Sequence, residues 1–183
     1  MKILKVFFLI LIFLIISQSY ALEIKRLKGY LYEKNILIDV FYKDFPFQDI
    51  VLSLKEQKDP VLIEYQFEIY RKRFLLKDIL LYKERYYQKI YYASDKNLYY
   101  LEDNFGLKTF EKPENAALSV VNLESYPLKY TFTPEKDSLI FRIKVILTYS
   151  THLSKDLKYT KKRHSKKIEI EKTVGINELL GKF

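Results

Sequence analysis

Apolar and polar residues alternate with a period of two through much of this chain, and this pattern constrains the fold more than any other feature. The sharpest case is VLIEYQFEIYR at residues 61–71, and residues 139–149 repeat it. A helix would scatter these apolar residues around its axis, whereas a strand gathers them on one face. We therefore expect antiparallel strands with one buried face and one wet face, the wet face carrying Glu64 and Glu68.

Further alternating runs extend the expected sheet. Residues 36–42 form a shorter run, and residues 22–32 are predicted to pair with it across a turn at residues 33–35. Residues 126–132 alternate in the same way just before the second of the two long runs. Residues 134–138, PEKDS, separate these two runs, and their composition predicts a hairpin turn.

A tyrosine-rich hairpin is expected at residues 80–101, with its turn at residues 94–97. The chain holds 17 Tyr and 13 Phe, and many of the tyrosines crowd the arms of this hairpin. Tyr doublets place one ring on each face of a strand, so one ring packs inward while the other keeps its hydroxyl in water. Tyr87, Tyr91 and Tyr99 are candidate contact residues for a sugar or a partner strand, although ordinary β packing is the simpler explanation.

Two segments depart from the alternation and indicate short amphipathic helices. Residues 48–55 carry apolar side chains at helical spacing, and residues 113–123 begin with a proline at a first-turn position. Residues 168–174 alternate again and indicate a last strand, followed by a loose or helical end at residues 177–183. The expected fold is a mainly β, antiparallel sandwich-like domain with two short helices.

The N-terminal residues predict an export signal. Lys2 and Lys5 precede an unbroken apolar run of 11 residues at 6–16, and small residues lead up to Ala21. This three-part pattern is typical of a signal peptide, and the run is short for a membrane-spanning helix. We expect a signal helix at residues 1–21, cleavage near Ala21, and a single β-rich domain at 22–183 in the periplasm or secreted. Retention of the segment as a membrane anchor is the alternative.

Composition argues against several classes of chemistry. The chain of 183 residues has no Cys, two His and four isolated Gly. This excludes disulfides, thiolate metal sites and a cysteine nucleophile, and it argues against a glycine-rich phosphate loop. Neither His152 nor His164 has a second ligand at metal-binding spacing. The run Ser150-Thr151-His152 puts a hydroxyl next to an imidazole in the sequence, but such adjacency is not the geometry of a catalytic triad. We expect no catalytic residue, no metal site and no cofactor.

Positive charge gathers near the C-terminus, within a net charge of +9. The basic segment covers residues 155–167, and its candidate binding residues are Lys158, Lys161, Lys162, Arg163, Lys166 and Lys167. Export makes nucleic acid an improbable partner, so an envelope protein or an anionic envelope component is expected instead. A solvated loop in a lysine-rich chain is the plainer explanation. Contact with a membrane is expected only through an uncleaved signal segment.

Four features follow one another in the middle of the chain: an arginine–aromatic–Asp stretch (residues 71–78), a tyrosine-bearing strand (85–91), Phe110 with a short Ala- and Leu-rich helix, and a strand pair within 126–148. In these features the chain resembles a family of exported bacterial proteins known as domain of unknown function 4390. The earlier helix at residues 48–54, before a long strand, also fits. The chain lacks the tryptophans common in that family. The resemblance implies an exported β domain and brings no activity.

These features leave three function hypotheses. The first is a non-catalytic envelope protein that binds through a strand edge, the tyrosine hairpin or the basic segment. The second is an envelope hydrolase that uses carboxylates, which requires two acids in one cleft. The third is an accessory subunit anchored by a retained signal segment.

Overall fold

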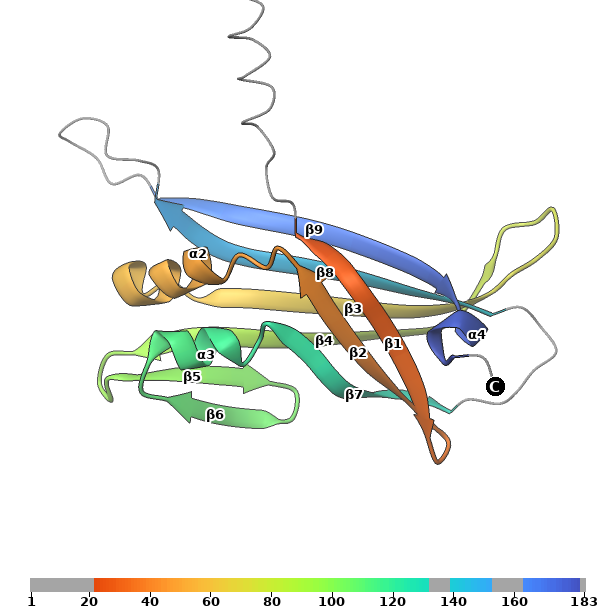
Figure 1. Cartoon of the computed structure of the whole chain (residues 1–183), viewed down its shortest axis with the longest axis horizontal. Helices are drawn as coiled ribbons and strands as arrows, with labels where there is room; N and C mark the ends of the chain where they lie inside the picture. The colour runs from red at the N-terminus through yellow and green to blue at the C-terminus, as the bar shows by residue number, and fades with distance from the viewer. Residues whose placement is uncertain (1–21, 132–138, 153–162, 182–183) are drawn as a thin grey trace, which may run out of the picture.

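The computed structural model describes residues 22–131, 139–152 and 163–181, and it is a mainly β domain of two antiparallel sheets (Figure 1). The smaller sheet has the order β1-β2-β7 and the larger one the order β6-β5-β4-β3-β8-β9. The strands are β1 (Glu23–Tyr32), β2 (Asn35–Lys43), β3 (Val61–Arg71), β4 (Ile79–Ala93), β5 (Leu98–Asp103), β6 (Gly106–Phe110), β7 (Asn122–Thr131), β8 (Leu139–His152) and β9 (Arg163–Gly175).

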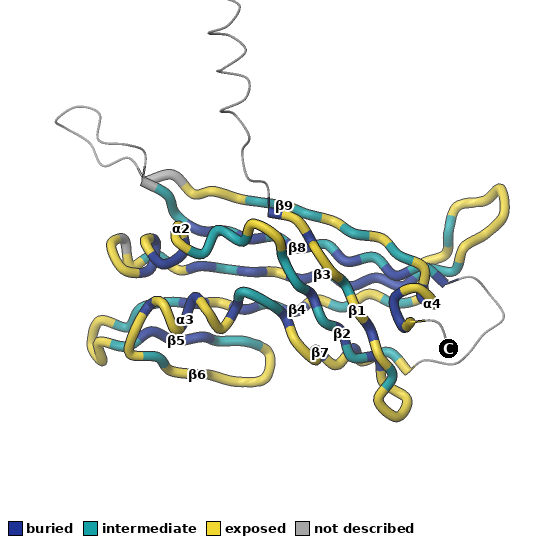
Figure 2. The backbone as a smooth tube through the Cα atoms, in the orientation of Figure 1, coloured by how far each residue is buried: buried dark blue, intermediate teal, exposed yellow. Residues whose placement is uncertain are grey.

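The hydrophobic core lies between the two sheets, as the alternation predicts (Figure 2). Strands β3 and β8 bury every second side chain, and β2 contributes Ile36, Ile38 and Val40 from the opposite sheet. Phe67 of β3 joins the layers, because its ring lies 4.9 Å from that of Tyr126 on β7 and 6.2 Å from that of Phe141 on β8. The predicted sandwich-like fold is therefore confirmed.

Two of the predicted hairpins are also confirmed. β1 pairs with β2 around Glu33 and Lys34, and β4 pairs with β5 around residues 94–97. Glu33 and Asn97 adopt left-handed backbone conformations, with φ of 57° and 55°, as tight turns require.

The hairpin expected between residues 126–132 and 139–149 is wrong. β7 pairs with β2 in the smaller sheet, whereas β8 pairs with β3 and β9 in the larger one. Alternation fixes which face of a strand is buried, but both sheets of a sandwich bury the same core, so it cannot fix the partner. The expected turn at residues 134–138 lies outside the described residues.

Short helices cover the ends of the sandwich. α2 (Phe47–Leu52) continues into a π-helical turn, η1 (Ser53–Gln57), and α3 (Pro113–Leu118) ends earlier than expected because Asn122 already begins β7. Both helices lie over one end of the larger sheet in Figure 1. α4 (Ile176–Leu179) follows β9 and packs against β1, where Gly29 lies directly beneath Leu179.

The outer face of the larger sheet differs from the expected wet surface at one residue. Glu64 is exposed, but Glu68 keeps only 6% of its surface. Lys83 Nζ lies 2.9 Å from Glu68 Oε1 and Arg142 Nη1 lies 3.8 Å from Oε2. The hydroxyl of Tyr70 also donates to Oε2, at 2.6 Å. Long side chains from the neighbouring strands therefore cover this carboxylate.

Residues 1–21, where the signal helix is expected, lie outside the described residues. Among the residues that the structure describes, no helix has the length and apolar character to cross a membrane.

Candidate functional site

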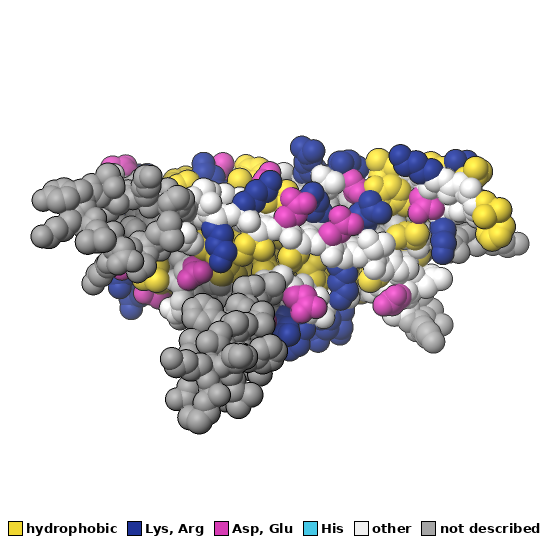
Figure 3. Space-filling view, turned by 90° about the horizontal axis from the view of Figure 1, so that it is seen from above, with side chains coloured by type: hydrophobic (Ala, Val, Ile, Leu, Met, Phe, Trp, Pro, Cys, Tyr) yellow, Lys and Arg dark blue, Asp and Glu magenta, His cyan; other side chains and the backbone are white. Residues whose placement is uncertain are grey.

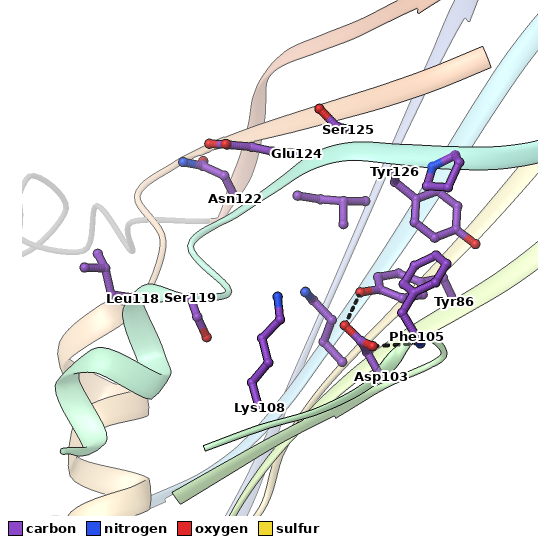
Figure 4. Close-up of a pocket in the computed structure, with 13 residues that line it drawn as sticks. Tyr86, Asp103, Phe105, Lys108, Leu118, Ser119, Asn122, Glu124, Ser125 and Tyr126 are labelled. Atoms are coloured by element: carbon purple, nitrogen blue, oxygen red, sulfur yellow. Dashed lines mark hydrogen bonds between the residues drawn. The ribbon is translucent and has the colours of Figure 1, made fainter. Parts of the chain in front are cut away.

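A cleft of about 580 Å³ opens between the β4–β6 part of the larger sheet and the segment that links α3 to β7 (Figure 4). The residues that line it are Tyr86, Gln88, Asp103, Phe105, Lys108, Leu118, Ser119, Asn122, Leu123, Glu124, Ser125, Tyr126 and Pro127. The cleft exists because β4, β5 and β6 extend the larger sheet past the edge of the smaller one, which ends at β7. A cleft of this size can hold a small ligand or a short polymer segment.

Three aromatic rings form one wall of the cleft. The rings of Tyr86 and Tyr126 lie 4.5 Å apart, and that of Phe105 lies 5.8 Å and 5.9 Å from them. Tyr86 and Tyr126 are buried, whereas Phe105 keeps 63% of its surface exposed. The two tyrosines thus hold an accessible ring in a fixed place, which is the arrangement of a stacking surface.

Asp103 fixes the turn that carries Phe105. One of its carboxylate oxygens accepts backbone hydrogen bonds from the N–H groups of Phe105 and Gly106, at 2.8 and 3.0 Å. The other accepts the hydroxyl of Tyr86 at 3.0 Å. Burial, and then the charge of Asp103, raise the pKa of Tyr86 well above its usual value, so this hydroxyl stays a donor at neutral pH.

Glu84 of β4 links the two walls of the cleft through hydrogen bonds to β7. It accepts hydrogen bonds from the hydroxyl of Tyr126 at 2.9 Å and from the backbone N–H of Lys129 at 3.1 Å, both on β7. The hydroxyl of Tyr82, its neighbour on β4, also donates to it. Burial, with this carboxylate beside it, raises the pKa of Tyr126, so the link between β4 and β7 persists across the physiological pH range.

A β-bulge shapes the opposite rim. Ile38 of β2 pairs with Tyr126 and Val40 pairs with Leu123, so two residues of β7, Glu124 and Ser125, face the single residue Asp39. Ser125 adopts a left-handed backbone with φ of 53°, and its N–H donates to Asp39 Oδ1 at 2.7 Å. Bulges re-aim side chains and are frequent beside functional sites, and this one leaves Glu124 on the cleft rim.

The polar groups around the cleft come from both walls. Figure 4 shows Lys108 extending from β6 toward β7, where Asn122 and Glu124 lie, with Ser119 at the end of α3. The cleft therefore offers an ammonium, a carboxylate, an amide and a hydroxyl around an aromatic wall. Within the described part of the chain, no group of three or more His, Asp or Glu side chains is placed to hold a metal ion.

Of the six basic residues named from the sequence, the structure describes Arg163, Lys166 and Lys167. Lys158, Lys161 and Lys162 lie outside the described residues, and Arg163 begins β9. Lys166 and Lys167 are exposed on β9, far from the cleft in the chain's topology. Lys166 lines a smaller depression of about 300 Å³ together with Leu22, Phe45 and Phe47, among others.

The tyrosines named from the sequence divide between the two faces of the larger sheet. Tyr87 and Tyr91 point outward, where Tyr91 stacks on Tyr100 with ring centroids 5.6 Å apart. Tyr99 points inward and keeps only 7% of its surface exposed, so it contributes to the core. The cleft instead uses Tyr86, from the tyrosine-rich hairpin, and Tyr126, from the alternating run at residues 126–132, and the sequence named neither as a contact residue.

Comparisons of the chain with protein-family models, with curated proteins and with solved structures find no match. The resemblance to domain of unknown function 4390 stays a prediction. The role of the cleft is therefore inferred from its own residues.

Proposed function

We propose that this protein is an exported, non-catalytic binding domain, and that its cleft holds a short stretch of glycan from the cell envelope. The observation that carries the proposal is the exposed ring of Phe105, held in the cleft by Tyr86 and Tyr126. A sugar ring presents a flat C–H face that can lie on such a ring. Its hydroxyls and N-acetyl groups would reach the amide of Asn122 and the charged ends of the rim residues.

A carboxylate-dependent hydrolase is the alternative, because two acids, Asp103 and Glu124, line the cleft. Glycoside hydrolysis needs one carboxyl group as acid and a second as base or nucleophile. Both oxygens of Asp103 already accept hydrogen bonds that build the β5–β6 turn and orient Tyr86. This engagement supports a structural role for Asp103 and favours binding over hydrolysis.

The test is the affinity of the protein for soluble envelope glycans, with N-acetylglucosamine tetrasaccharide as the first probe and a muramyl disaccharide as the second. Calorimetry measures the affinity, and Phe105→Ser is the variant. We expect the variant to bind about tenfold more weakly or worse, because the stacking ring is lost while the fold stays intact.

The matched control is Leu107→Ser, on the strand that follows Phe105. Leu107 is 54% exposed, close to the exposure of Phe105, but it does not line the cleft. This variant should bind like the wild type. Equal affinities of wild type and Phe105→Ser, or no binding of either glycan, would contradict the proposal. Shorter sugars that appear with the wild type and not with Glu124→Gln would favour the hydrolase.

A further inference from the structure

The hairpin between β3 and β4 ends in three exposed apolar residues, Phe74, Leu75 and Leu76, here called the hairpin tip. They keep 89%, 87% and 63% of their surfaces exposed. Behind them, Leu80 at the start of β4 keeps 46%. The hairpin projects from the end of the molecule opposite α2 and α3 (Figure 1). Folding gains almost nothing from these side chains, because water still covers them.

The turn that presents the hairpin tip has a defined conformation. The N–H of Arg73 donates to Asp78 Oδ1 at 3.2 Å, and Arg73 Nε donates to the carbonyl of Lys77 at 3.2 Å. Leu75 has a left-handed backbone with φ of 61°, a conformation that favours Gly or Asn over a bulky residue. The chain thus places a large apolar side chain where a small residue would cost less.

Basic residues flank the hairpin tip on both sides. Lys72, Arg73 and Lys77 are exposed, and the nearby Asp78 accepts the hydrogen bond that closes the turn. Figure 3 shows apolar and basic side chains gathered at this end of the molecule. Along the middle of the same view, acidic and basic side chains are interspersed instead. Within residues 72–78 three cations therefore outnumber the single acid, Asp78.

We propose that the hairpin tip docks onto an anionic lipid membrane, with its apolar side chains among the acyl chains and its cations at the phosphates. Apolar residues framed by Lys and Arg have the chemistry of interfacial membrane contacts, where each cation strengthens attachment to anionic headgroups. This role goes beyond the binding cleft. It also goes beyond the sequence-based expectation, which confined membrane contact to residues 1–21.

The shape of the hairpin tip favours lipid over a protein partner. A stable protein interface needs about 800 Å² on each partner, which three side chains on a narrow projection do not supply. A bilayer needs no complementary groove, since it deforms around an inserted side chain. The surrounding positive charge matches a surface of phosphates rather than a mixed protein surface.

The test uses the absence of Trp from the chain. In the full-length variant Phe74→Trp, all indole fluorescence comes from the hairpin tip. With vesicles that contain phosphatidylglycerol we expect the emission to shift to shorter wavelength, and lipids brominated on their acyl chains should quench it. Vesicles of phosphatidylcholine alone should give a much weaker response, because they lack the anionic headgroups.

Neutralising the cations measures their share of the attachment. In the Phe74→Trp background, Lys72→Gln, Arg73→Gln and Lys77→Gln should each weaken binding to the anionic vesicles about fivefold, and together about 100-fold. The matched control is Leu107→Trp, another exposed site, in the same full-length chain. Its emission should not respond, whatever residues 1–21 do, because the probe reports only its own surroundings.

Three outcomes would overturn the proposal. The emission of Trp at position 74 could stay unchanged with anionic vesicles, or it could shift equally with neutral ones. It could also shift with protein concentration in the absence of lipid, which would assign the hairpin tip to contact between copies of this chain. In each case the affinity of the cleft for glycans is measured separately, so the two proposals fail independently.

Discussion

Glu68 is a single residue whose environment differs from the one that the sequence predicts. The alternation places Glu68 on the outer, solvent-facing side of β3. Its side chain does point to that side, yet it is buried there. Burial by itself would raise the pKa of this carboxyl. Hydrogen bonds from Tyr70 and Lys83, and the positive charges beside it, outweigh that effect and lower the pKa. The sequence could not show this, because the covering groups come from three strands.

The lowered pKa makes a prediction about stability and pH. A carboxyl whose pKa is lower in the folded than in the unfolded state stabilises the fold above its unfolded value, about 4.3, and loses this effect as pH falls through the folded value. Glu68→Gln should therefore lower the free energy of unfolding by about 1–3 kcal/mol at pH 6. The gap from the wild type should shrink below pH of about 4.3. Urea unfolding at several pH values measures both.

The control for this experiment is Glu64→Gln. Glu64 lies four positions before Glu68 on the same face of β3, and its side chain is exposed. It should change the free energy of unfolding by less than about 0.5 kcal/mol. A gap between wild type and Glu68→Gln that stays constant from pH 6 to pH 3 would contradict the assignment of charge to this carboxylate.

At the scale of the elements, the packing of α4 on β1 depends on one glycine. A Cβ atom on Gly29 would lie 2.8 Å from Cγ of Leu179, closer than real contacts allow, and 3.2 Å from its Cδ2, which is a tight contact. The helix can approach this strand only because that side chain is missing. The sequence predicted both the strand and a helical or loose end, but not that the two touch.

Gly29→Ala should lower the free energy of unfolding by about 1–3 kcal/mol, because the new methyl group forces Leu179 out of its place. Leu179→Ala alone should cost about 2–5 kcal/mol through the cavity that it leaves. In the double variant the two costs should be less than additive, since the smaller side chain makes room for the methyl group. Denaturant unfolding of the four proteins measures this coupling.

Gly175→Ala is the comparison, since a Cβ there meets no atom within 4 Å. It should change the free energy of unfolding by less than about 1 kcal/mol. If Gly29→Ala and Leu179→Ala lowered the free energy of unfolding by strictly additive amounts, α4 would not be in close contact with β1 in solution.

For the whole molecule, the position of a strand in its sheet predicts how it exchanges its amide hydrogens. β3 and β8 are hydrogen-bonded on both sides and bury one face, whereas β6 lies at one edge of the larger sheet and pairs only with β5. We expect the amides of β3 and β8 to exchange slowest and those of β6 fastest among these three strands. Hydrogen–deuterium exchange read by mass spectrometry tests this order, and equal protection of β6 and β3 would contradict it.

The sequence predicted the whole molecule better than it predicted the site. Alternation at residues 61–71 and 139–149 sufficed to predict a mainly β sandwich, because the pattern shows which face of each strand is buried. It did not show that β7 pairs in the smaller sheet, since the pairing of a strand depends on strands distant in the chain. The cleft depends on that crossing: Phe105, Glu124 and Tyr126 meet only because β7 lies opposite β4 and β5.

The length of β4 also determines how far the cleft lies from the hairpin tip. The strand runs from Ile79, beside the hairpin tip, to Ala93, and it carries Tyr86 of the cleft partway along. Tyr86 lies six positions after Leu80, which at a strand's rise of about 3.3 Å per residue is at most about 20 Å, because the register shift between Leu80 and Tyr82 shortens the strand locally. With the hairpin tip on a bilayer, β4 would hold the cleft at this distance from the lipid surface. Only envelope polymers that pass at this distance from the lipid would then reach the cleft.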